Sequence, residues 1–124
     1  MSKENDQKIK VSFPHMGSLH IVLGSLVKSL GGEVVPPPKT TKKTLSLGTK
    51  YSPEAICLPY KLLLGNYIEA AEKGANAVLM ISSPGICRLG EYSKSIKNAL
   101  DDLGYKLKYI YSNILSANCL IFSV

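Results

Sequence analysis

Residues 77–81 read AVLMI, with an apolar side chain at every position. A strand that faces water on one side alternates apolar and polar residues, so a run that is apolar on both faces predicts a central parallel strand covered by helices. Helical patterns flank this run. Pro59 suits the first turn of a helix that Gly74 ends, and a second helix is expected over roughly 91–103, closed by Gly104. AVLMI therefore predicts the centre of an α/β sheet.

The N-terminal third of the chain has the pattern of a βαβ unit. Residues 9–13 form a short β-type run, residues 17–30 place apolar side chains at helical spacing, and residues 33–35 form a second β-type run. Residues 107–111 predict a last strand. Strands that alternate with helices predict an α/β fold, with a parallel sheet and helices on both faces, of flavodoxin or Rossmann type.

Two short elements are expected between these parts. Thr40 or Thr41 can cap a brief helix that runs through about Leu47, with Gly48 as its stop. Residues 55–58 (AICL) predict a third buried strand or its end.

The length of 124 residues predicts one domain. We expect residues 1–7 to be a disordered N-terminal segment and residues 8–111 to form the α/β domain. Residues 112–124 look like an unfinished element of a truncated domain, because no helix follows to cover their apolar stretch. A homodimer is one way to cover it.

Composition narrows the class of protein. The chain has no apolar window long enough for a membrane helix and no secretory signal, so we expect a cytoplasmic protein without a membrane partner. The net charge is +6, but most basic residues are dispersed and Arg88 is the single arginine, which argues against nucleic acid as a partner.

The cysteines at positions 57, 87 and 119 are odd in number and widely spaced, which does not resemble a disulfide framework. Cys57 and Cys87 are expected at the carboxyl ends of two parallel strands, where α/β sheets bind ligands. Neighbouring strand tips lie about 5 Å apart, so both thiolates could reach one metal centre. The alternative is that each cysteine is a small buried hydrophobe, which we favour for Cys119.

Other side chains could take part at the same edge. His15 could be a third ligand or a proton donor, although a cap of the first helix is the simpler role, and His20 is expected to be structural. Lys61 could bind a phosphate or acyl group, or be solvated, and Arg88 could add positive charge near a thiolate. A zinc site needs four good ligands, and the sequence offers three candidates: Cys57, Cys87 and His15. Zinc is therefore a poor second choice. The usual dinucleotide, P-loop and thioredoxin motifs are absent from the sequence.

Two longer stretches carry a family resemblance. VVPPPKTTKKTLSLGTKYSPEAICLPYKLLLGNYIEAAEKGANAVL (residues 34–79), followed by CRLGEY (residues 87–92), resembles the acyl-CoA dehydratase activase-related proteins. These are similar to subunits of the 2-hydroxyacyl-CoA dehydratases, the group of 2-hydroxyglutaryl-CoA dehydratase and benzoyl-CoA reductase. The match covers roughly residues 8–110.

The resemblance implies a flavodoxin-like domain that binds a 4Fe–4S cluster. Cys57, in a C-x-P-x-K segment with Lys61, and Cys87, in a C-R-x-G-x-Y segment with Arg88 and Tyr92, match the family's ligand motifs. The resemblance also implies that Lys61, Arg88 and Tyr92 lie at the cofactor. His15 is a further candidate for binding it, because His15 follows the first predicted strand. In such dehydratases an ATP-hydrolysing activase sends one electron to the cluster-bearing component, which forms a ketyl radical and eliminates water from an acyl-CoA.

This chain departs from the family in two ways. Family members continue into a second α/β domain with a further cysteine ligand, and the glycine-rich lead-in to the second cysteine reads SSPGI here (residues 82–86). We therefore expect an electron-accepting module that is incomplete as an enzyme alone. Its partner would be an ATP-dependent activase or a second dehydratase-type subunit. The alternative is a metal-free α/β interaction or small-molecule-binding module from a truncated gene.

Overall fold

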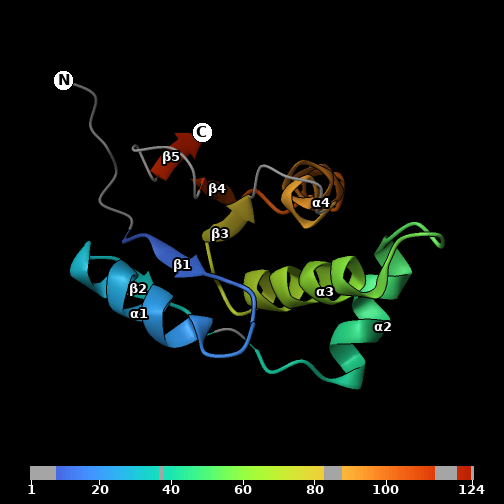
Figure 1. The fold of residues 1–124 in the computed structure, drawn as a ribbon, viewed down its shortest axis with the longest axis horizontal. Helices are drawn as coiled ribbons and strands as arrows, with labels where there is room; N and C mark the ends of the chain where they lie inside the picture. Colours follow the sequence, from blue (N-terminus) through green and yellow to red (C-terminus); the bar gives the residue numbers. More distant parts are fainter. Residues whose placement is uncertain (1–7, 37, 83–87, 114–119, 124) are drawn as a thin grey trace.

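A computed structural model describes residues 8–36, 38–82, 88–113 and 120–123 of the chain, and Figure 1 shows their arrangement. Within these residues five strands form one sheet in the order β2-β1-β3-β4-β5. The strands are β1 (Lys10–Ser12), β2 (Glu33–Val34), β3 (Ala77–Ser82), β4 (Lys108–Asn113) and β5 (Leu120–Ser123). The AVLMI run thus lies in the middle strand, which confirms that prediction.

The sheet is parallel from β2 to β4. β1 pairs in parallel with both β2 and β3, β3 pairs in parallel with β4, and β5 is antiparallel to β4. In the register of β3 and β4, Val78 lies opposite Tyr109 and Leu79 lies opposite Ile110. This order is the flavodoxin-like one, and it confirms the predicted single α/β domain.

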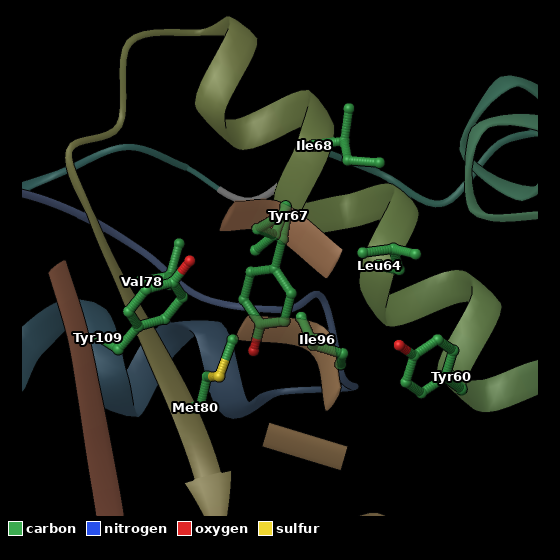
Figure 2. Close-up of a cluster of buried hydrophobic side chains, with 9 residues drawn as sticks. Tyr60, Leu64, Tyr67, Ile68, Val78, Met80, Ile96 and Tyr109 are labelled. Carbon is green, nitrogen blue, oxygen red and sulfur yellow. The ribbon is translucent and has the colours of Figure 1, made fainter. Parts of the chain in front are cut away.

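Helices cover both faces of the sheet. The helices are α1 (Leu19–Ser29), α2 (Lys42–Tyr51), α3 (Leu58–Glu72), α4 (Tyr92–Asp102) and the short 3₁₀ helix η1 (Arg88–Gly90). Val78 and Met80 pack with side chains of α3 and α4 (Figure 2), while Ala77 and Leu79 pack with Val27 of α1. Alternate residues of β3 therefore enter two separate hydrophobic clusters.

Helix α2 approaches α3 so closely that two backbones touch. A Cβ atom added at Gly48 would lie 1.7 Å from the carbonyl oxygen of Lys61, and one added at Gly65 would lie 2.1 Å from that of Thr44. Thr41, one of the two predicted cap residues, caps α2, and it does so with a reciprocal capping box. The expected stop at Gly48 is wrong, because this glycine lies inside α2 and permits the close approach.

Residues 55–58 do not form a strand, and that prediction is also wrong. Ala55 is exposed and Leu58 is 56% exposed, so this apolar run buries little surface. Cys57 has an extended backbone and is the N-cap residue of α3, with Pro59 in the first helical turn. Proline at this position favours a helix start, and the buried face of α3 begins with Tyr60.

Helix α1 has an apolar outer face, which consists of Ile21, Val22, Leu26 and Leu30 at its end. Ile21 and Val22 are 62% and 65% exposed, while Val27 on the inner face is buried. No helix in the described ranges is both long and apolar enough to span a bilayer.

Candidate functional site

A cavity of about 510 Å³ opens beside the N-terminal half of α3. It is lined by His15 and Met16 of the loop after β1. The helices that follow β1 and β3, α1 and α4, pack on opposite faces of the sheet. Flavodoxin-like sheets bind ligands at this point. The lining side chains are His15, Met16, Thr40, Cys57, Pro59, Leu62, Leu63, Asn66, Arg88 and Tyr92.

Cys57 contributes an exposed thiol to this cavity. It precedes the first turn of α3, where unpaired N–H groups and the helix dipole favour an anion. Its position at a helix N-terminus agrees with the sequence prediction, but its predicted position at a strand tip does not. The strand tips at this edge are those of β1 and β3.

Tyr92 of α4 is the hydrogen-bond partner of this thiol. The Cys57 Sγ and Tyr92 Oη atoms are 2.5 Å apart, and the Tyr92 ring packs edge-on against Tyr60 with 5.2 Å between ring centroids. This hydrogen bond lowers the pKa of the Cys57 thiol below its ordinary value. The nearby Tyr60 backbone N–H lowers this pKa too, and the charge of Arg88 adds a smaller effect in the same direction.

Arg88 and His15 line the same cavity, so the structure brings two further predicted residues to Cys57 and Tyr92. His15 does not cap the first helix, because the N-cap residue of α1 is Ser18. Its ring stacks on His20, with centroids 5.3 Å apart, and His20 Nδ1 lies 2.8 Å from the Gly17 carbonyl oxygen. His20 thus has a structural role.

Lys61 turns away from this group. It is absent from the cavity lining, and its Nζ donates a hydrogen bond of 3.3 Å to the Glu54 carbonyl oxygen. Cys87 and Cys119 lie outside the described residues. In the part of the chain that the structure describes, no three His, Cys, Asp or Glu side chains gather as metal ligands would.

Asn66 is a cavity residue that sequence reasoning missed. It is 3% exposed, and its Oδ1 atom has no hydrogen-bond partner among the described residues. Leu62, Leu63 and Asn66 are spaced so that they share one helix face, and an amide on an otherwise apolar face was the available signal.

The comparison with protein families decides where this chain belongs. Residues 15–106 match the family described as CoA enzyme activase uncharacterised domain (DUF2229). The chain belongs to this family. The match spans β2, β3 and the cavity residues from His15 to Tyr92. No curated protein and no solved structure matches the sequence. Membership in this family of CoA enzyme activase uncharacterised domains confirms the activase-related part of the resemblance, and the relation to dehydratase subunits stays a prediction.

Proposed function

We propose that this activase-related domain holds an iron–sulfur cluster at the cavity, with Cys57 and Cys87 as two of its ligands, and accepts an electron there. The observation that carries the proposal is the Cys57 thiol, which is exposed, lies at the cavity and has a lowered pKa. A thiolate is the form of cysteine that ligates metals.

The residues at the cavity fit part of such a site. Iron–sulfur clusters are held by cysteine thiolates, commonly four, and Cys57 supplies one from the described residues. Cys87 immediately precedes Arg88 in the sequence, and Arg88 lines the same cavity. The remaining ligands would have to come from another polypeptide segment or subunit, which agrees with the expectation that this domain does not work alone.

Two residues would prepare the site. The Tyr92 hydroxyl can donate its hydrogen bond to the Cys57 sulfur and hold it at the end of α3. Hydrogen bonds to ligand sulfurs tune the potential of a cluster, as do nearby charges such as that of Arg88. When bound, a cluster would supply one-electron transfer.

The proposed partner is the electron donor. We infer an ATP-dependent activase or a second dehydratase-type subunit, because the family name itself associates the domain with activases of CoA enzymes. Such a partner would contribute the missing ligands or the electron.

Anaerobic reconstitution with iron and sulfide tests this proposal. The chain should acquire the visible absorption of a cluster and an EPR signal after reduction, and bound iron and sulfide should be measured. Cys57→Ala and Cys87→Ala should each lose most of the bound iron, while Cys119→Ala, the matched control, should keep it. Equal iron in all variants, or none in the parent chain, would overturn this proposal, and the second result would favour the metal-free alternative.

A further inference from the structure

We propose that the cavity also binds a small, mainly apolar organic molecule that carries a hydrogen-bond donor for Asn66 and an anionic end for Arg88. This inference does not require a bound iron–sulfur cluster, because Asn66, Arg88 and the apolar walls are side chains of this chain that line the cavity without one.

The inner end of the site is defined by Asn66. Its side chain is 3% exposed and lines the cavity, and its Oδ1 atom has no partner in the described structure. A buried acceptor without a partner raises the free energy of the folded protein, and native structures contain few of them. Oδ1 has less than 1 Å² of accessible surface, so rotation of the Asn66 amide toward the cavity would present it to a ligand. A ligand N–H or O–H group would then remove the penalty, which gives the cavity a reason to prefer a donor at this point.

The walls between the two ends are apolar. Met16 lies on one side, and Pro59, Leu62 and Leu63 follow one another along α3. The cavity volume of about 510 Å³ falls within the range of about 300–1,000 Å³ that is usual for small-molecule sites. These walls favour an aromatic or aliphatic body over a polar metabolite.

The outer end is positively charged. Arg88 lines the cavity there, and the first turn of α3 adds the positive end of its dipole. Cys57 and Asn66 are nine positions apart (66 − 57), which is about 13 Å along a helix axis. A ligand of roughly two or three rings therefore spans from the first turn of α3 to the Asn66 amide.

Anilinonaphthalene sulfonate (ANS) has this combination of groups: two ring systems, one N–H and one sulfonate. Two related probes each lack one group. N-phenylnaphthylamine has the N–H without the anion, and naphthalene sulfonate has the anion without the N–H. Binding is measured on the iron-free full chain, by fluorescence for the two anilino compounds and by displacement of ANS for the third.

Each polar contact is tested by its own variant. Asn66→Leu should weaken ANS and N-phenylnaphthylamine about tenfold and leave naphthalene sulfonate nearly unchanged, because loss of one buried hydrogen bond has about this effect. Arg88→Gln should weaken ANS and naphthalene sulfonate about threefold, as expected for an exposed charge contact, and spare N-phenylnaphthylamine.

Exposed apolar surface elsewhere is the competing site for such probes. The double variant Ile21→Ser and Val22→Ser removes two of the most exposed side chains on the outer face of α1 and should not change ANS affinity. Near-UV circular dichroism shows whether each variant is folded. Arg88→Gln changes an exposed residue, so it remains informative if Asn66→Leu does not fold.

The proposal is overturned if ANS fails to bind, if the α1 variant alone abolishes binding, or if both cavity variants bind all three probes like the parent chain. Iron binding is measured separately, so a chain that takes up a cluster but no probe would refute this inference and leave the proposed function intact.

Discussion

At the scale of single residues, Tyr92 controls the chemistry of Cys57. The thiol is exposed, and its hydrogen bond with the Tyr92 hydroxyl has the largest effect on its pKa. A hydrogen bond favours a thiolate when the hydroxyl donates to the sulfur. Reactivity of this cysteine should therefore depend on a residue that lies 35 positions further along the chain.

Tyr92→Phe should raise the pKa of Cys57 toward its ordinary value, because the variant loses the donor that stabilises the thiolate. Below that pKa a smaller fraction of thiol is ionised, so alkylation by iodoacetamide at neutral pH should slow several-fold. The measurement is the rate of Cys57 modification against pH, followed by mass spectrometry on the iron-free protein.

Tyr51→Phe is the matched control, because Tyr51 is an exposed tyrosine at the end of α2, outside the cavity lining. Its pH profile should overlay that of the parent chain. An unchanged profile in Tyr92→Phe would show that the hydroxyl does not stabilise the thiolate in solution.

At the scale of helices, the crossing of α2 and α3 depends on two glycines. Gly48 faces the Lys61 carbonyl and Gly65 faces the Thr44 carbonyl, each without room for a methyl group. The opposing atoms belong to helix backbones, which cannot rotate away as a side chain can. The Thr44 hydroxyl also donates a hydrogen bond of 3.2 Å to the buried Glu69 carboxylate, which fixes the same crossing.

Gly48→Ala should lower the free energy of unfolding by about 2–3 kcal/mol, because the added methyl group forces the helices apart. Urea denaturation followed by circular dichroism measures this change.

Gly24→Ala is the matched control, since a Cβ at this position in the interior of α1 meets no atom within 4 Å. It should leave stability unchanged or raise it by up to about 1 kcal/mol, because alanine favours helices. Equal effects of the two substitutions would contradict the close crossing.

The same helices show how far sequence could predict this fold. AVLMI was decisive because burial on both faces has a direct signature, and Pro59 and Gly74 marked the limits of α3 within two residues. Residues 55–58 gave a wrong strand because local apolarity does not reveal burial. Gly48 was misassigned because its reason is a contact with Lys61 in another helix, which no local pattern records.

The candidate site was predictable to a similar extent. Motifs selected Cys57, Arg88 and Tyr92, and the structure brings these three to one cavity. The role of Asn66 depends on a missing hydrogen-bond partner, which only three-dimensional packing can show.

At the scale of the whole molecule, β3 joins two hydrophobic clusters through its alternating side chains. Tyr67 of α3 packs in the larger one, and its hydroxyl donates a hydrogen bond of 3.1 Å to the Leu79 carbonyl oxygen of β3. Burial raises the pKa of Tyr67, and burial together with the nearby Asp101 carboxylate raises the pKa of Tyr109.

These tyrosines predict alkaline unfolding. A phenol with a raised pKa keeps its proton in the folded state after the unfolded chain has lost it, so stability is complete below pH about 10 and falls above it. Each such group should contribute a slope of up to about 1.4 kcal/mol per pH unit above that point.

Tyr67→Phe should remove one of these contributions and leave a shallower decline. Urea unfolding between about pH 8 and about pH 11 measures it, and the lysines titrate equally in both chains. If the two chains lose stability in parallel, ionisation of Tyr67 does not contribute to alkaline unfolding.

The glycine contacts between α2 and α3 also determine which side of the cavity can move. One wall, from Cys57 to Asn66, belongs to a helix that is locked to its neighbour, while the loop at Met16, which also lines the cavity, follows a three-residue strand. Amides near Met16 should therefore exchange with deuterium faster than those of α3, and occupation of the cavity should slow mainly the loop. The rigid helix would act as a template against which the loop becomes ordered.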